Sequence, residues 1–371
     1  MTKETTKTSK EVAAKHEDEL QEPGQAKTRF QYCAVSPRAE RTFSPEVNAS
    51  RQRLILGLGD KWLNGTVLHF CFLDQASWRG SDAAKEVVRK AFKVWKAVGI
   101  GLEFKEVKTR SEAEIRIGFL QGDGSWSYLG RDILNYPANE RTMNFGWDIT
   151  RSPREIDTAI HEIGHTLGFP HEHQNPNAGI AWNEEKVYAE LASPPNNWPR
   201  TTTFENIIRK LDPRDVAGST WDPNSVMHYP FEPGLIKSPP PYDKNGINPA
   251  GGLSSKDKEI ALKYYPTLPT QVIELKPFVS VPLQLGEDHQ QNFKVIPQAS
   301  RNYSFATFGS SDAVLGLFEN IDGVPRYIKA DDDSGQDRNA TLKVRLVKGR
   351  EYVLRVRVYH QQAEQVAIMM W

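Results

Sequence analysis

The residues of this chain that could do chemistry are concentrated in one short stretch. Five of its nine histidines fall there, namely His161, His165, His171, His173 and His228. His161 and His165 are four positions apart, so on a helix they would project from the same face. Gly168 can end that helix in a left-handed conformation and turn the chain back, which would bring His171 to the same point. Three neutral imidazoles that leave a fourth position open are typical of a catalytic Zn²⁺ site, whose bound water has a pKa near about 7.

Glu162 directly follows the first of these histidines. A carboxylate at that position can take the proton from the water as the water attacks a carbonyl carbon. The spacing HExxHxxGxxH therefore predicts metal-assisted hydrolysis of an amide. His173 fits no position of this pattern, and we interpret it as a residue beside the ligands or at the surface.

The helix that would carry the first two histidines has its own start signal. Ser152 and Glu155 have the spacing of a capping box, and Pro153 takes the first helical position, where its missing N–H costs nothing. Apolar residues then recur at helical spacing and predict one buried face, made of Ile156, Ala159, Ile160, Ile163 and Leu167.

The elements around this helix alternate between strand and helix patterns. A second helix is predicted from Ser81 or Asp82 to Gly99, on its apolar periodicity. Alternating or β-branched runs predict strands at 67–72, 102–107 and 113–119, with weaker candidates at 127–129 and 142–145. The first part of the chain is therefore expected to be an α+β domain.

Beyond residue 268 the helical pattern stops. Short alternating runs at 303–308, 341–347 and 352–359 predict an all-β sandwich. At roughly 150 residues per domain, 371 residues suggest two domains and a tail. We assign the tail to residues 1–50, the α+β domain to 51–268 and the sandwich to 269–371.

Composition excludes several classes of partner. Lys plus Arg and Asp plus Glu are both 47, so the chain lacks the net positive charge typical of nucleic-acid binders. No apolar run approaches the roughly 20 residues of a membrane-spanning helix. Residues 1–29 contain no apolar segment typical of a secretory signal.

The tail leaves two alternatives open. Its polar and charged composition favours a disordered extension, whereas a small cluster of Phe30, Tyr32 and Cys33 could dock it as a pro-segment. A Cys33 thiolate could then block the metal, since thiolates bind Zn²⁺ well. The sequence favours a structural cysteine instead, either free or bridged to Cys71.

Three motifs in order resemble one family. The run HEIGHTLGFPHE at 161–172 fits the astacin pattern HExxHxxGFxHE, and SVMHY at 225–229 fits the SxMHY Met-turn. LSSKD at 253–257, followed by Tyr264, is similar to the LSxxD…Y element near the end of an astacin catalytic domain. The chain thus resembles the astacin-like metzincin zinc endopeptidases over roughly residues 55–266.

The resemblance implies a zincin-like fold, with a mixed twisted sheet and an active-site helix, that hydrolyses peptide bonds in protein or peptide substrates. It implies one catalytic zinc ion held by His161, His165 and His171. Glu162 would be general base and acid, Met227 a hydrophobic floor, and Tyr229 a weak or swinging ligand that stabilises the oxyanion. An edge strand near 125–130 could pair with an extended substrate.

The chain also departs from the family pattern. At 173–176 this chain has HQNP where animal astacins have an RxDRD-like run, so the chain is more similar to a microbial branch of the family. The usual cysteines and the FxGD pro-segment motif are missing. The C-terminal part resembles the bacterial pre-peptidase C-terminal β-sandwich, a module of secreted hydrolases. That favours an extracellular location, although no signal peptide is visible. Asp331, Asp332 and Asp333 offer oxygen ligands for Ca²⁺, but without a loop of spaced ligands an acidic turn is favoured.

Two other functions fit the same motifs. One is an inactive binding or adhesion protein with the metzincin fold, against which the intact His161, Glu162, His165 and His171 argue. The other is a zinc amidase that acts on a non-peptide amide. The sequence leaves the cleavage specificity and the oligomeric state open.

Overall fold

The structure is a computed structural model. It describes residues 30–35, 61–62, 64–212, 220–268, 272–283, 290–310, 313–321, 323–331, 334–335, 339–358 and 366–371. The chain divides into two compact units, residues 1–30 and 31–371, and the elements and site residues below belong to the second unit. Among the described residues, no helix has the length and apolarity needed to cross a membrane.

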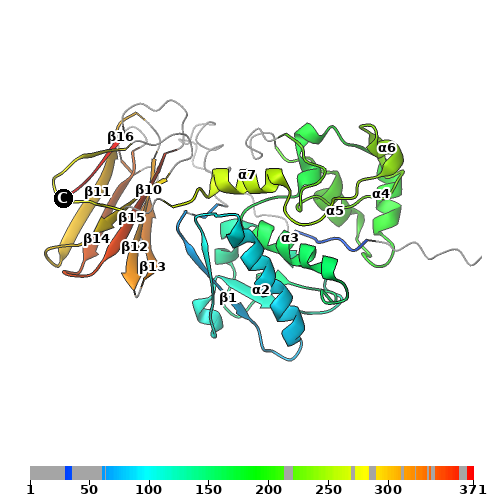
Figure 1. Cartoon of the computed structure of the whole chain (residues 1–371), viewed down its shortest axis with the longest axis horizontal. Coiled ribbons are helices and arrows are strands. Elements are labelled where there is room, and N and C mark those ends of the chain that lie inside the picture. Colours follow the sequence, from blue (N-terminus) through cyan, green and yellow to red (C-terminus); the bar gives the residue numbers. More distant parts are fainter. Residues whose placement is uncertain are drawn as a thin grey trace, which may run out of the picture. The chain divides into compact units, whose positions relative to one another are not determined.

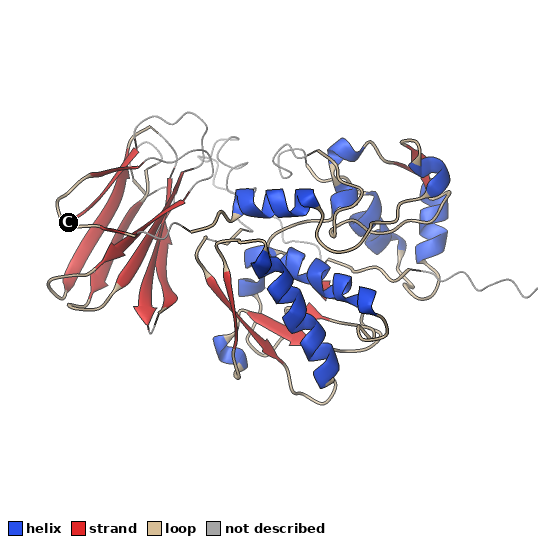
Figure 2. Cartoon of the chain, in the orientation of Figure 1, coloured by secondary structure: helices blue, strands red, loops and turns tan. Residues whose placement is uncertain are grey.

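The first part of the second unit contains a five-stranded mixed sheet (Figure 2). Its strands, in the order β2-β1-β3-β5-β4, are Glu103–Glu106, Val67–Phe72, Ile115–Gly118, Met143–Asn144 and Trp126–Ser127. The first four run parallel, and β4 pairs antiparallel with β5 at the edge. The predicted strands are confirmed, although most are shorter than their patterns suggested. The mixed sheet and the edge strand agree with the fold that the motifs imply.

Two helices pack together beside this sheet (Figure 1). Helix α2 (Asp82–Ala97) begins after Ser81, whose hydroxyl accepts a hydrogen bond from the Ala84 N–H. Helix α3 (Ile156–Thr166) contacts it closely, because the Trp95 indole N–H donates to the Ile160 carbonyl at 2.9 Å. The predicted helices are confirmed, and α3 is anchored through its backbone to the core.

The predicted capping box at the start of α3 is wrong. Pro153–Glu155 form a short 3₁₀ turn (η3) before the helix, and the Ser152 side chain makes no capping hydrogen bond. The Glu155 carboxylate instead accepts hydrogen bonds from the Trp147 indole and from the Arg151 guanidinium. A cationic donor satisfies the carboxylate better than a neutral backbone N–H would, which accounts for its pairing with Arg151.

A polar, loop-rich region separates α3 from the last helix of this part. Its helices are α4 (Glu184–Leu191), α5 (Arg200–Thr203), the π-helix η6 (Phe204–Ile208) and α6 (Tyr242–Asn245), and the last helix is α7 (Ser255–Tyr264). The strands β6 (Ala181–Trp182) and β7 (Ile236–Ser238) pair antiparallel. Short 3₁₀ turns are η1 (Arg110–Glu112), η2 (Gly130–Asn135), η4 (Glu172–Gln174) and η5 (Pro176–Ala178).

After α7 the only regular elements among the described residues are strands. They form two sheets, with the orders β13-β12-β15-β10-β8 and β14-β11-β16-β9. Their bounds are β8 Ile273–Glu274, β9 Val281–Leu283, β10 Gln290–Val295, β11 Arg301–Phe308, β12 Ala313–Ile321, β13 Val324–Asp331, β14 Thr341–Leu346, β15 Tyr352–Val358 and β16 Val366–Met370. A separate apolar core built around Phe293, Phe305 and Leu354 lies between them. The predicted β-sandwich is confirmed.

The acidic run in this sandwich shows no sign of a calcium loop where it is described. The Asp331 carboxylate accepts backbone hydrogen bonds from Ser334 at 3.0 Å and Thr341 at 2.8 Å, as in an acidic turn. Asp332 and Asp333 lie outside the described residues.

Candidate metal centre

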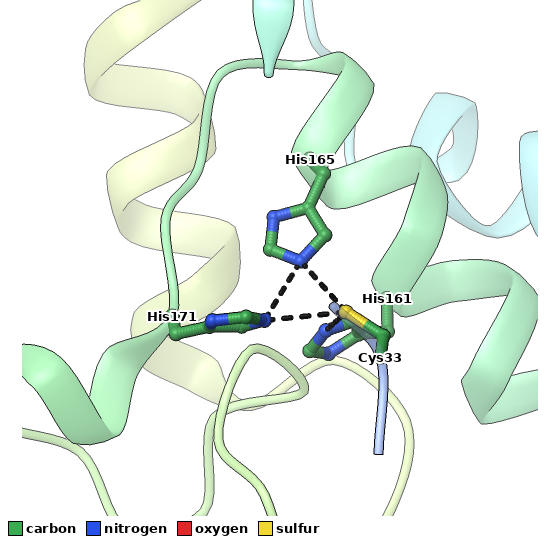
Figure 3. A group of neighbouring side chains, drawn as sticks. All are labelled: Cys33, His161, His165 and His171. Carbon is green, nitrogen blue, oxygen red and sulfur yellow. Dashed lines mark hydrogen bonds between the residues drawn. The ribbon is translucent and has the colours of Figure 1, made fainter. Parts of the chain in front are cut away.

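Three histidine side chains and one cysteine side chain converge on a single point (Figure 3). The Nε2 atoms of His161, His165 and His171 lie 3.5, 3.4 and 3.3 Å from the Sγ atom of Cys33. All four side chains are buried, and their candidate ligand atoms lie within 4.8 Å of one another. The structure thus brings together the three histidines that the spacing singled out and adds Cys33 from the tail.

The two helical histidines are oriented by carbonyl groups behind them. Nδ1 of His161 lies 2.7 Å from the Val226 carbonyl oxygen, and Nδ1 of His165 lies 2.8 Å from that of Phe169. A carbonyl oxygen can only accept, so each Nδ1 carries the proton and donates it. The lone pair of each Nε2 is then directed at the shared point, the arrangement that metal-binding histidines usually have.

His171 reaches this point because the chain turns sharply after α3. Gly168 has φ +90°, the left-handed conformation expected from the sequence, and its N–H donates to the His165 carbonyl at 2.8 Å. The next residue after His171 is held as well, since the Glu172 N–H donates to the Met227 carbonyl at 3.0 Å. Backbone hydrogen bonds thus hold the chain both before and after His171, which fixes the position of the third imidazole.

The donor atoms fit a tetrahedral zinc ion. With Zn–N bonds of about 2.0–2.1 Å and Zn–S bonds of about 2.3 Å, tetrahedral angles place nitrogen and sulfur ligands about 3.5 Å apart. The three sulfur–nitrogen separations of 3.3–3.5 Å match this value. The Nε2 atoms of His165 and His171 are 3.1 Å apart, near the roughly 3.3 Å expected for two nitrogen ligands.

Burial sets the charge of these groups. It lowers the pKa of His161 to about 4 and that of His171 well below the usual value, so both imidazoles are neutral at neutral pH. Burial also raises the pKa of the Cys33 thiol and of the Glu162 carboxyl well above their usual ranges. None of the imidazoles then carries a positive charge. A bound metal ion would supply the positive charge that the thiol and the carboxyl need in order to ionise.

Glu162 lies on α3 next to the first histidine and is fully buried. Neither of its carboxylate oxygens has a hydrogen-bond partner of ordinary geometry among the described residues. Buried carboxylates without partners are rare, because losing their hydration is costly. This carboxylate is therefore available for a ligand that enters the centre.

The Met-turn beneath the centre is tied to α7. The Ser225 hydroxyl donates to the Asp257 carboxylate at 2.6 Å, and the Val226 N–H donates to it at 2.9 Å. Asp257 also completes a capping box with Ser254 at the start of α7. The LSxxD motif thus holds the loop whose Val226 carbonyl orients His161.

Met227 packs against helix α3, and its place beneath the metal, which the resemblance implies, stays a prediction. It is buried, and its thioether sulfur occupies the space that a side chain at Gly164 would need. The glycine in HEIGH therefore lets the helix lie directly on the methionine.

Tyr229 reaches into the centre from the same loop. Its phenol oxygen lies 2.6 Å from Nε2 of His171 and 3.0 Å from Sγ of Cys33. His173 packs behind it, with ring centroids 4.7 Å apart, and its Nε2 lies 2.8 Å from the Asn206 carbonyl oxygen. His173 is buried, so the surface alternative for it was wrong and the position beside the ligands is the one observed.

The bridged alternative for Cys33 was wrong, and its sulfur lies among the three histidines. Cys33 and Cys71 are both free, and Cys71 is buried away from the centre with Leu73 and Ala113. Residues 32–35 of the tail are docked at the centre. The sequence signal for docking was the small apolar cluster around Tyr32.

Two asparagines that the sequence analysis missed hold this part of the tail. The Tyr32 N–H donates to Oδ1 of Asn196 at 2.9 Å, and the Val35 N–H donates to Oδ1 of Asn206 at 2.8 Å. Asparagines in loops are common, and only the folded chain brings these two to the same segment. No spacing in the sequence could have identified them.

Comparison with known proteins identifies a peptidase family with the same motifs. The family model described as Astacin, a family of peptidases, matches residues 58–233. Bone morphogenetic protein 1 of Xenopus laevis is 33% identical over 153 residues, and Zinc metalloproteinase nas-36 of Haemonchus contortus is 27% identical over 140 residues. Each match covers 38% of this chain but only 19% and 20% of those proteins, so the chain spans about a fifth of their length.

A solved structure matches a larger share of the chain than these two relatives do. The protein in "Structure of myroilysin" is 33% identical, with a TM-score of 0.51. The match covers 57% of this chain and 97% of that one, so nearly the whole of that protein has a counterpart here.

Proposed function

Because this chain belongs to the astacin family of peptidases, we propose that it is a zinc-dependent endopeptidase that hydrolyses peptide bonds in protein or peptide substrates. We also propose that the chain as it stands is latent. One observation carries both proposals, namely the tetrahedral spacing of three imidazole nitrogens and the Cys33 sulfur. Residues 51–268 would be the catalytic domain and residues 269–371 a sandwich appended to it.

In this proposal His161, His165 and His171 hold the zinc ion. When bound, zinc polarises the scissile carbonyl and lowers the pKa of a water in the fourth position. The carboxylate of Glu162 takes the proton from the attacking water and later delivers it to the leaving amine. Its burial and the absence of a hydrogen bond of ordinary geometry from the described residues support this role, and the Cys33 thiol, which interacts with the carboxylate, leaves on activation.

Tyr229 would stabilise the negative charge that develops on the carbonyl oxygen. Its phenol is buried in the centre and close to His171, where it can donate a hydrogen bond to an oxyanion. The ring is supported from behind by His173, which itself bonds to backbone. A donor held in place in this way loses little energy in reorganising during the reaction.

The substrate would bind in extended form along the edge strand β4. Among the described residues this strand pairs with β5 alone, and the pairing is antiparallel. An open strand edge offers backbone groups to a peptide in the mode called β-augmentation.

Latency follows from the position of Cys33. Its sulfur takes the fourth tetrahedral position, and it is only 3% exposed. With that position taken, neither a water nor a substrate carbonyl can reach the centre. Activity then requires that Cys33 leave, by cleavage of the tail or by chemical modification of the thiol.

The alternatives predict different behaviour. An inactive binding protein would bind peptides without cleaving them after Cys33 is removed, and a non-peptide amidase would leave peptides intact. The edge strand and the tail segment seated across the centre favour a peptide ligand.

The test replaces Glu162 by alanine in a chain already opened by Cys33→Ala. Zinc content should stay at one ion per chain by metal analysis, while cleavage of a peptide library should fall by several orders of magnitude. Glu184→Ala, an exposed glutamate on α4, is the matched control and should change neither quantity. Retained activity in Glu162→Ala, or a native protein without zinc, would overturn the proposal.

A further inference from the structure

We propose that the pocket occupied by Tyr32 is the specificity pocket of this peptidase, and that it selects substrates with a tyrosine side chain next to the scissile bond. This inference rests on the proposed function. It starts from a simple adjacency: Cys33 blocks the centre, and Tyr32 is its neighbour in the chain. The Cys33 sulfur lies where the scissile carbonyl of a substrate would bind. The side chain of Tyr32 therefore lies where a substrate residue that flanks the scissile bond would place its own side chain.

Three aromatic side chains lie close to the ring of Tyr32. The ring of Tyr32 is stacked on Phe231 with centroids 5.8 Å apart and an interplanar angle of 22°. Tyr229 lies 5.0 Å away and Trp198 6.3 Å away, both tilted. Tyr32 is only 5% exposed in this setting. Offset and tilted aromatic pairs of this kind favour a flat ring over an aliphatic side chain of similar volume.

The end of the pocket recognises a hydroxyl group. The Tyr32 phenol donates a hydrogen bond to the Pro230 carbonyl oxygen at 2.9 Å. A phenylalanine would fill the same space but would leave this acceptor without its partner, and sites built around a hydroxyl reject analogues that lack it. The pocket should therefore prefer tyrosine over phenylalanine, and phenylalanine over leucine or alanine.

Charge near the pocket disfavours acidic side chains. Burial, together with the nearby carboxylates of Glu190 and Glu232, raises the pKa of the Tyr32 phenol. A carboxylate brought into the same place would be desolvated and repelled by both glutamates. Aspartate and glutamate should therefore be the poorest residues in this pocket.

The contacts around the pocket divide into two kinds. Asn196 and Asn206 accept hydrogen bonds from backbone N–H groups, which every peptide provides, and so can position a substrate without selecting its sequence. The aromatic walls and the Pro230 carbonyl contact the side chain alone. Selectivity therefore lies in the walls rather than in the asparagines.

The test uses the full chain with Tyr32→Ala and Cys33→Ala, which frees both the pocket and the centre. A peptide library randomised on both sides of the scissile bond is digested, and the products are sequenced by mass spectrometry. Tyrosine should be enriched at one of the two positions that flank the cleaved bond. In matched peptides, kcat/KM should be about tenfold higher for tyrosine than for phenylalanine and about a hundredfold higher than for alanine, with aspartate lowest. A flat profile, or a preference for aliphatic or acidic residues, would overturn the inference.

A second variant tests the wall itself. Trp198→Ala should reduce the preference for tyrosine over alanine at least severalfold, whereas Tyr327→Ala, an exposed aromatic of the sandwich, should leave it unchanged. Binding gives a readout that does not need turnover. Glu162→Ala is added to the chain that carries Tyr32→Ala and Cys33→Ala, so that peptides bind without being cleaved. Titration of the same peptides by fluorescence anisotropy should then give the same order of affinities.

These readouts separate the two proposals. Cleavage without tyrosine preference would overturn the pocket alone. Tyrosine-selective binding without any cleavage by the chain that retains Glu162 would support the pocket and overturn the endopeptidase.

Discussion

The phenol oxygen of Tyr229 lies 3.0 Å from the sulfur of Cys33 and 2.6 Å from the backbone carbonyl oxygen of the same residue. A phenol has one proton, so it can donate to only one of these acceptors at a time. The same oxygen lies 2.6 Å from Nε2 of His171. The group proposed to stabilise the oxyanion is therefore engaged by the tail, and release of the tail frees it together with the fourth position of the centre.

Replacing Cys33 by alanine should activate the uncleaved chain. The substitution removes the sulfur that would fill the fourth position, while His161 and His165 keep the carbonyl partners that orient them. We expect peptidase activity to rise at least about tenfold over the unmodified chain, because a site blocked by a thiolate gains access to water. The measurement is hydrolysis of a quenched fluorescent peptide by full-length protein.

The other cysteine provides the control for this experiment. Cys71 is also buried and free but lies away from the centre, so Cys71→Ala should leave the uncleaved chain as inactive as before. Equal activity in the native chain and in Cys33→Ala would show that the sulfur blocks nothing.

Replacing Tyr229 by phenylalanine should slow the reaction without loss of zinc. The ring and its packing on His173 remain, and only the hydroxyl is lost. Removing one oxyanion donor typically lowers kcat by about 10²–10³-fold, with a much smaller effect on KM. Steady-state kinetics in the Cys33→Ala background, together with zinc analysis, check this. A fall in zinc content in step with activity would mean that Tyr229 serves mainly to bind the metal.

The spacing of the histidines predicted the centre because helical geometry is local. His161 and His165 share a face of α3 for the reason that places any pair four residues apart together, and Gly168 adopts the left-handed turn that glycine favours. The capping box failed because its carboxylate found a better partner. Glu155 binds Arg151 and Trp147, and a pattern of capping residues says nothing about such competing donors.

Contacts between segments far apart in the chain could not be predicted from the sequence. Cys33 meets His161 across 128 positions of the chain, and no periodicity links them. The tail is mostly polar and charged, which predicts that its early part cannot fold alone. A segment that cannot fold alone can still bind a surface that the rest of the chain provides, and here Asn196 and Asn206 provide it.

Replacing Asp257 by asparagine should weaken both the fold and the centre. One oxygen of its carboxylate accepts a hydrogen bond from the Ser225 hydroxyl, and the other accepts one from the Val226 N–H. The side-chain amide of asparagine has a single oxygen, so it cannot replace both acceptors. Leaving one buried donor unpaired costs about 1–3 kcal/mol in the free energy of unfolding. Urea denaturation should detect this loss, and kcat/KM should fall because the Val226 carbonyl orients His161.

An exposed acidic residue of the same helix is the control for Asp257. Glu259→Gln on α7 should alter neither stability nor activity. Unchanged stability in Asp257→Asn would mean that the Met-turn does not depend on α7.

Removal of zinc should expose the thiol of Cys33 selectively. In the native chain both cysteines are buried, and a thiolate bonded to a metal has its reactive electron pair engaged, so a thiol reagent should label neither quickly. After chelation, the segment around Cys33 keeps only its hydrogen bonds and the packing of Tyr32, whereas Cys71 remains in its apolar cluster. We therefore expect one rapidly labelled thiol per chain after chelation, absent in Cys33→Ala and still present in Cys71→Ala. Added zinc should restore protection, because the same four donors would close around the ion again. Equally fast labelling of Cys33 with and without zinc would mean that its sulfur is not bonded to the metal, and latency would then need another cause.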